Sequence, residues 1–189
     1  MLSAECWFQF VNLQSKIVIH MTSQEFKKLL DMAEKSPEQV ARAVMGLPAK
    51  VLQYKPAPNK WSVQEILAHL ADSELVYGYR LRQAVADKEP TFAPIDQDAW
   101  ASKLGYMEPT TPELIALYSL LRRANLRVLR RLKPADLEKG GYHPEHKRKV
   151  TVGEIVQMMA KHGPNHLEQI ERLKQMAGAA PSGKKPRVH

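Results

Sequence analysis

Cysteine is nearly absent from this sequence of 189 residues, in which Cys6 is the only one. A single cysteine allows no intrachain disulfide, which excludes a small secreted scaffold held by cross-links and indicates a reducing compartment. Long apolar runs are absent too, whereas a membrane-spanning helix needs about 20 apolar residues. The first residues lack the basic start, apolar stretch and cleavage site of a secretory signal. We therefore expect a cytoplasmic protein with no membrane-spanning segment.

Nothing in the overall composition is extreme, with 44% hydrophobic and 25% charged residues. These values exclude collagen-like and fully disordered chains, and a chain of this length can bury one core without cross-links. We expect a single folded domain at residues 21–176. Residues 1–20 are interpreted as an N-terminal extension that precedes a second plausible start, and residues 177–189 as a disordered basic tail.

Positive charge is in excess, since 28 Lys and Arg face 20 Asp and Glu and give a net charge of +8. The excess gathers in residues 122–133 and 147–149, a distribution that attracts polyanions such as nucleic acid. The sequence has no helix-turn-helix spacing, zinc-finger signature or aromatic stacking platform. We therefore interpret the basic run as a solvated helix face and do not expect nucleic acid as a partner.

Helix-start signals recur along the chain as a Ser or Thr followed three residues later by Glu or Gln, the pattern of a capping box. The four pairs are Thr22 with Glu25, Ser36 with Gln39, Ser62 with Glu65, and Thr151 with Glu154. Thr111 followed by Pro112 marks a further start. Because residues 22–46 hold two of these signals, we expect that segment to form two capped helical pieces.

Apolar residues after the later starts recur at the 3, 4, 7 spacing of an amphipathic helix. This spacing predicts helices at about 62–87, 111–132 and 151–173. With residues 22–46 they predict an all-α four-helix bundle. Residues 88–110 are too long for a tight helix hairpin, so we expect a long crossover connection there, with a short helix near 96–103. Residues 138–149 are expected to be irregular, because no alternating strand pattern appears outside the N-terminal extension.

Three histidines carry the candidate chemistry. His162 and His166 are four residues apart, so both project from the core-facing side of the last helix. Their spacing suits two ligands of one metal ion, although a core histidine is more often structural. His69 flanks the apolar stripe of its own helix, where it could meet the last helix. Three neutral imidazoles would bind a divalent transition metal such as Zn, Ni, Fe or Mn and leave positions open for water or substrate.

Two long motifs resemble those of the DinB/YfiT-like superfamily. They are P-A-P-N-K-W-S-V-Q-E-I-L-A-H-L-A-D-S-E at residues 56–74 and T-V-G-E-I-V-Q-M-M-A-K-H-G-P-N-H-L-E-Q-I at residues 151–170. The resemblance covers about residues 21–174. It implies a four-helix bundle with a long crossover and a divalent metal held by His69, His162 and His166. It also implies frequent homodimers and, in studied relatives, metal-dependent thiol chemistry.

The reaction itself stays open. A metal held by three imidazoles acidifies a bound water or ionises an incoming thiol, which suits a hydrolase or a thiol-dependent S-transferase acting on a small molecule. Because Cys6 lies in the extension, a thiol would come from a low-molecular-weight cofactor. The alternative is a non-catalytic metal-binding protein, of the stress-response or interaction type, that dimerises through its helices.

Neighbouring polar residues supply further candidates. Glu74 falls within the apolar stripe of its helix, and a buried carboxylate needs a partner. Structural pairing to an arginine such as Arg80 or to a tyrosine hydroxyl is the favoured role. Glu74 is also the one candidate for a catalytic base. Asp72 points to the opposite side of the helix and is expected to be solvated. Gln169, one turn after His166, either orients a ligand or substrate or makes a helix–helix hydrogen bond.

Two further features bear on the site. His143 and His146 lie in a basic loop, where they either approach the open face of the metal or are solvated. Gly163 and Pro164 separate the two histidines of the last helix, and proline both removes an N–H and crowds the carbonyl four residues earlier. We expect a kink or local unwinding there, which would disturb the geometry of the two ligands.

Overall fold

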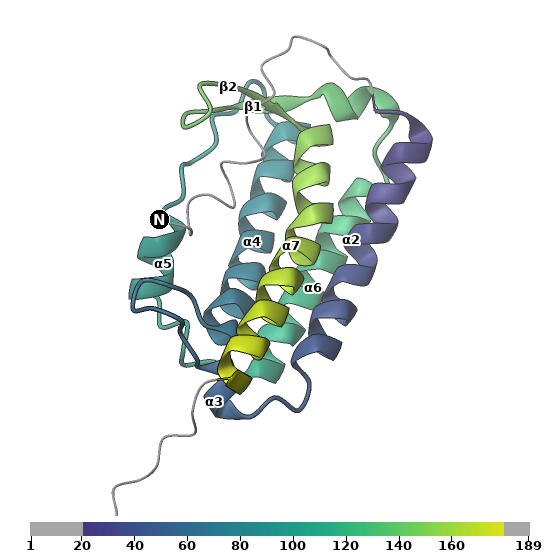
Figure 1. Cartoon of the computed structure of the whole chain (residues 1–189). Helices are drawn as coiled ribbons and strands as arrows, with labels where there is room; N and C mark the ends of the chain where they lie inside the picture. The colour runs from purple at the N-terminus through teal and green to yellow at the C-terminus, as the bar shows by residue number, and fades with distance from the viewer. Residues whose placement is uncertain (1–20, 180–189) are drawn as a thin grey trace, which may run out of the picture.

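The structure, a computed structural model, describes residues 21–179 and contains a bundle of four long helices (Figure 1). The long helices are α2 (Ser23–Val44), α4 (Val63–Ala86), α6 (Thr111–Leu129) and α7 (Val152–Ala179). The shorter elements are α3 (Ala49–Leu52), α5 (Gln97–Lys103), the 3-10 helix η1 (Pro134–Glu138), and the strands β1 (Gly140–His143) and β2 (Arg148–Thr151). The predicted four-helix bundle is confirmed. The predicted extension at 1–20 and residues 180–189 of the predicted tail lie outside the described residues, whereas residues 177–179, also assigned to the tail, belong to α7.

The helices α4 and α6 run parallel, because the connection between them returns along the side of the bundle (Figure 1). The starts of the two helices lie together, and Thr111 Oγ1 donates a hydrogen bond to Gln64 Oε1 (3.1 Å). The returning segment carries α5, so the predicted crossover with its short helix is confirmed. The helices α2 and α7 run antiparallel to α4 and α6. Helix α2 packs against α6, helix α7 packs against α4, and α2 and α7 also contact each other.

Capping boxes fix the starts of the four long helices. In each one a Ser or Thr side chain accepts a hydrogen bond from the backbone N–H three residues on, and the glutamate there bonds back. The capping residues are Thr22, Ser62, Thr110 and Thr151. Three of these boxes match the predicted ones. In the fourth, the partner is Glu113, which moves the start signal of α6 from the predicted Thr111 to Thr110.

Residues 23–44 form one continuous helix, so the prediction of two capped pieces is wrong. Ser36 is buried and its hydroxyl pairs with that of Tyr118 (2.9 Å) instead of capping a helix. Pro37 lies inside α2 and lacks the N–H that would bond to the carbonyl of Ala33. Arg122 Nη1 donates to that carbonyl (2.9 Å). A side chain from α6 therefore supplies the hydrogen bond that proline removes.

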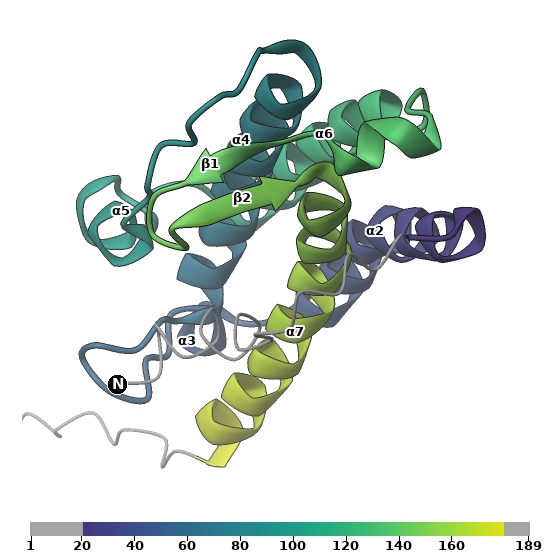
Figure 2. The same cartoon turned by 90° about the horizontal axis from the view of Figure 1, so that it is seen from above.

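A β-hairpin replaces the irregular stretch predicted at residues 138–149. The strands β1 and β2 pair antiparallel and lie across one end of the bundle (Figure 2). The hairpin is tied to the crossover, because Phe92 N–H donates to the carbonyl of Tyr142 (2.9 Å). Gly141 permits this contact, since a Cβ there would lie 2.6 Å from the Phe92 ring. The strands are too short, and β1 too rich in glycine, for an alternating pattern to show in the sequence.

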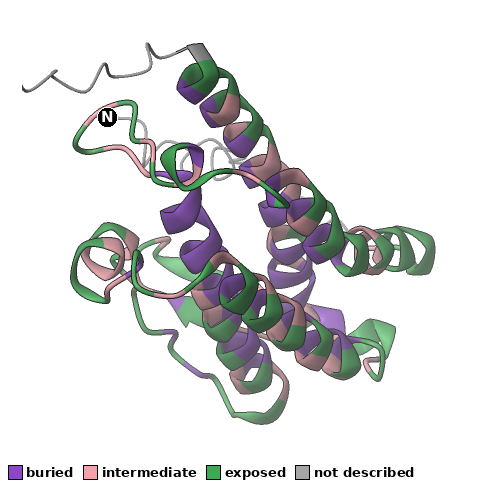
Figure 3. Cartoon of the chain, turned by 90° about the horizontal axis from the view of Figure 1, so that it is seen from below, coloured by how far each residue is buried: buried purple, intermediate pink, exposed green. Residues whose placement is uncertain are grey.

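Buried residues line the inner sides of the long helices (Figure 3). The helix α4 is the most deeply buried, and its apolar stripe includes Ile66, Leu70 and Leu81, all without exposed surface. This agrees with the apolar spacing read from the sequence. Within residues 21–179, no helix combines the length and apolar character needed to span a membrane.

Candidate metal centre

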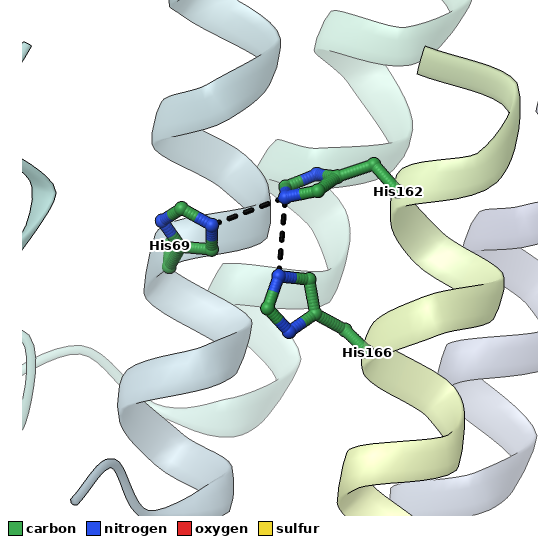
Figure 4. A group of neighbouring side chains, drawn as sticks. All are labelled: His69, His162 and His166. Atoms are coloured by element: carbon green, nitrogen blue, oxygen red, sulfur yellow. Dashed lines mark hydrogen bonds between the residues drawn. The ribbon is translucent and has the colours of Figure 1, made fainter. Parts of the chain in front are cut away.

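Three histidines from two helices meet in the interior of the bundle (Figure 4). His69 comes from α4, and His162 and His166 come from consecutive turns of α7. The Nε2 atom of His162 lies 3.1 Å from Nε2 of His69 and 3.1 Å from Nε2 of His166. All three side chains are buried. The structure thus brings together the three residues that the sequence singles out as ligands.

The spacing of these nitrogens fits a single metal ion. Imidazole nitrogens bind zinc at about 2.0 to 2.1 Å, so two ligands at octahedral or tetrahedral angles lie roughly 3.0 to 3.4 Å apart. The two measured separations of 3.1 Å fall inside this range. Among residues 21–179, no other group of three or more His, Cys, Asp or Glu side chains brings its ligand atoms this close together.

Burial keeps the three imidazoles neutral. It lowers the pKa of His69 and of His162 well below 6.5, and the neighbouring imidazoles add to the effect. Burial also lowers the pKa of His166 to about 4, against the opposing effect of its hydrogen bond to Gln169. Only a neutral imidazole has a lone pair for a metal ion. At neutral pH each of the three imidazoles therefore has one ring-nitrogen lone pair, which a metal ion would engage in place of the hydrogen bonds between the Nε2 atoms.

Gln169 sets the orientation of His166. Its Oε1 atom lies 3.0 Å from His166 Nδ1 and accepts the Nδ1–H, so the Nε2 lone pair stays free for a metal. Of the two roles left open by the sequence, the structure shows that Gln169 orients a candidate ligand.

Replacing Gln169 by leucine should weaken metal binding by about 10- to 100-fold, because His166 loses the acceptor that holds its tautomer. Competition with a chelating dye measures the affinity. Gln175→Leu, an exposed position on the same helix, is the matched control and should bind metal as the wild type does. Equal affinities for the two variants would show that the hydrogen bond does not matter.

The helix α7 continues without a break through Gly163 and Pro164, so the predicted local unwinding between the two histidines is absent. Glycine is required at 163 by close packing, since a Cβ there would lie 1.7 Å from Ser36 Oγ and 2.8 Å from the Tyr118 hydroxyl. Packing against α2 and α4 holds α7 on both sides of the proline. Tertiary contacts therefore override the local preference of proline to break the helix.

Gly163→Ala should lower the free energy of unfolding by about 1 to 3 kcal/mol, because the added methyl group overpacks the contact with α2. Gly178→Ala on the same helix is the matched control, since its Cβ would have no neighbour within 4 Å. The control should be neutral or up to about 1 kcal/mol more stable. Urea unfolding of the metal-free proteins measures both, and equal stability of the two variants would contradict the packing argument.

Glu74 is held in a buried ion pair. Its Oε1 atom lies 2.7 Å from Arg122 Nη2, and the side chains are 0% and 1% exposed. Asn125 Nδ2 donates to Oε2 (3.1 Å). The partner is therefore Arg122 rather than Arg80. Arg122 also corrects the expectation that the basic run 122–133 is a solvated face, because this member of the run points into the core.

Two other sequence expectations need correction. Asp72 is half-buried rather than solvated, because Tyr106 from the crossover covers it and donates its hydroxyl to Oδ2 (2.7 Å). His143 is buried at the hairpin, where its ring stacks on that of His146. Neither hairpin histidine belongs to the converging group formed by the other three. Both corrections arise because the crossover and the hairpin pack against α4.

The fold is a four-helix bundle in which α4 and α6 are parallel, and its interior holds a group of three histidines. Together these features define a helical protein with a candidate metal centre. The chain belongs to the DinB superfamily, whose model matches residues 32–170. The family expected from the two sequence motifs is thus confirmed.

Several relatives carry names that refer to metal-dependent hydrolysis. A protein of Bacillus mycoides (strain KBAB4) is 30% identical over 82% of this chain and 88% of its own length. One from Oceanobacillus iheyensis is 29% identical, over 88% of this chain and 91% of its own. Each of the two carries the name "putative metal-dependent hydrolase".

Solved structures share the fold. YfiT from Bacillus subtilis, described as a probable metal-dependent hydrolase with an unusual four-helix bundle topology, matches with a TM-score of 0.80 at 22% identity. The match covers 88% of this chain and 95% of that one. A DinB-like protein from Bacillus cereus matches with a TM-score of 0.55 at 15% identity, over 88% and 100% of the two chains.

Proposed function

We propose that this protein is a metal-dependent enzyme of the hydrolase type, with a divalent transition-metal ion held by His69, His162 and His166. The convergence of three buried imidazoles carries the proposal, with His162 Nε2 3.1 Å from the Nε2 atom of each of the other two. The names of the relatives support it. When bound there, the ion supplies Lewis acidity, which polarises a substrate oxygen and acidifies a water or a thiol.

The surrounding residues of the chain hold and shield the histidines. Trp61 lies against His69 with ring centroids 4.7 Å apart, and Tyr77 meets the ring of His162 edge-on at 5.7 Å. Burial raises the pKa of Tyr77, so its hydroxyl stays protonated. These aromatic rings exclude water from two of the three imidazoles, which strengthens electrostatic interactions at the centre.

A role for Glu74 as the catalytic base stays a prediction. Both of its carboxylate oxygens already accept hydrogen bonds, from Arg122 and from Asn125. This arrangement supports the structural alternative, in which the carboxylate holds α4 against α6.

Thiol transfer is the second form of the proposed activity. Residues 21–179 contain no cysteine, so a thiol nucleophile would come from a low-molecular-weight co-substrate. Incubation of the metal-loaded protein with esters and amides, and separately with a thiol and an electrophile, distinguishes hydrolysis from transfer. The homodimer implied by the resemblance also stays a prediction, and analytical ultracentrifugation tests it.

The test of the proposal compares the metal-free protein with protein reconstituted with Zn, Ni, Fe or Mn. We expect turnover in one of the two screens only after reconstitution. Turnover that persists in the chelated protein would contradict the proposal. A metal that raises thermal stability without turnover in either screen would support the non-catalytic alternative instead.

A further inference from the structure

Among residues 21–179, a buried arginine near the C-terminal end of α4 has no anionic partner. Arg80 is 4% exposed, and its Nη2 atom donates to the carbonyl of Ala93 (2.7 Å). Its guanidinium lies over the Phe92 ring, 5.9 Å from the centroid. Within the part of the chain that the structure describes, no carboxylate comes within 4.0 Å of it. Buried arginines are normally paired, because an unpaired charge in the interior is costly.

Two imidazoles of the hairpin, those of His143 and His146, lie near this arginine, since the Phe92 ring that Arg80 covers also meets the His143 ring edge-on, with centroids 6.4 Å apart. His143 is 2% exposed, and neither of its ring nitrogens has a hydrogen-bond partner. The ring of His146 stacks on it, with centroids 4.2 Å apart and planes 33° from parallel. A buried polar group without a partner in a native protein calls for an explanation, and a bound ion or ligand is one of those that apply.

Positive groups outnumber negative ones around His143 and His146. Burial, Arg80 from α4, His146 and Arg148 from β2 all lower the pKa of His143, to about 4. Arg148 is itself paired with Glu154 of α7 (2.7 Å). The carboxylate of Glu145 is 53% exposed and lies 4.0 Å from His143 Nδ1, and it favours the charged forms of Arg80 and His146.

The cluster lies on the same side of α4 as the metal centre. Arg80 follows His69 by about three helical turns, so the two side chains leave the same face roughly 16 Å apart along the axis. The crossover covers this face at both places, because Tyr106 bonds to Asp72 and the carbonyl of Ala93 accepts from Arg80. The crossover segment therefore adjoins both the metal centre and the Arg80 cluster.

We propose that Arg80, His143 and His146 form an oxyanion subsite that binds a carboxylate or phosphate group of a small-molecule substrate. The guanidinium of Arg80, the unpartnered imidazole of His143 and the neighbouring imidazole of His146 supply N–H donors, and the anion supplies the negative charge that Arg80 lacks. The link to substrate rests on the proposed function, since the reacting group of such a substrate lies at the three histidines. Binding of the anion itself does not need the metal.

Titration of the metal-free wild-type protein with inorganic phosphate, at constant ionic strength, tests the subsite without interference from the metal. We expect phosphate to shift the imidazole NMR signals of His143 and His146. Calorimetry should show binding that Arg80→Gln weakens by at least about tenfold, since a charged hydrogen bond is lost. Arg82→Gln is the matched control, because Arg82 is exposed and bonds to the carbonyl of Gly78. It should leave the affinity unchanged.

Unchanged imidazole signals, or an Arg80→Gln protein that binds phosphate as the wild type does, would overturn the subsite. Equal shifts of the imidazole signals with chloride would also overturn it, since they would show that the ions only screen the positive charges and do not bind at the subsite. If Arg80→Gln does not fold, the wild-type NMR titration still decides. Phosphate binding without any metal-dependent turnover would count against the proposed enzyme but not against the subsite, so the two failures are distinguishable.

Discussion

Replacing His166 by alanine should empty the metal centre. We expect about one equivalent of a transition metal in the wild-type protein and less than about a tenth of that in His166→Ala. The reason is geometric, because the buried His166 Nε2 lies 3.1 Å from His162 Nε2 and no other described ligand atom of the converging group can take its place. His162→Ala should lose the metal as well, since this imidazole contacts both of the others.

Elemental analysis by mass spectrometry, on protein purified without chelator or affinity tag, measures the metal content. His146→Ala is the control, because this histidine is partly buried but lies outside the converging group. It should keep the full metal content. Equal metal content in His166→Ala and the wild type would mean that metal is held elsewhere, and the proposed centre would then be wrong.

Replacing Glu74 by glutamine should destabilise the fold more than other single changes of polar residues. It leaves the guanidinium of Arg122, which is 1% exposed, without a compensating charge. Breaking one side of a buried ion pair costs about 3 to 5 kcal/mol. Urea unfolding of the metal-free protein measures the loss of unfolding free energy, provided that its slope against urea concentration is the same in both proteins.

The exposed pair formed by Glu34 and Arg130 is a matched control, with side chains 54% and 49% exposed and a separation of 2.6 Å. Glu34→Gln should cost less than about 1 kcal/mol, since water screens this pair. The double variant with Glu74→Leu and Arg122→Met should be more stable than either single variant, because no charge is left alone. A Glu74→Gln protein as stable as Glu34→Gln would contradict the argument.

Arg122 connects the ion pair to the metal centre. It bonds to Glu74 of α4, to the Ala33 carbonyl left open by Pro37, and to the Tyr118 hydroxyl. That hydroxyl pairs with Ser36, which packs directly against Gly163. One buried network thus fixes α2, α4 and α6 around the turn of α7 that carries two of the histidines.

Much of this architecture is readable from the sequence, because its signals are local. A capping box needs only residues three apart, and an apolar stripe needs only one helix. The same holds for His162 and His166, whose spacing of four residues places them on one side of α7. His69 is different, since its place beside the apolar stripe of its helix made a meeting with the last helix only one option. The motifs shared with the DinB/YfiT-like superfamily implied its role as a ligand.

Tertiary structure alone decided the features that depend on a distant partner. The continuity of α2 across Pro37 requires a donor from α6, and the partner of Glu74 is on that same helix. His143 is buried because the hairpin packs on α4. No local pattern encodes which side chain arrives from another element. The sequence by itself therefore determined where the helices begin and which faces they bury, whereas packing between helices decided which polar groups are paired and which are left for a ligand.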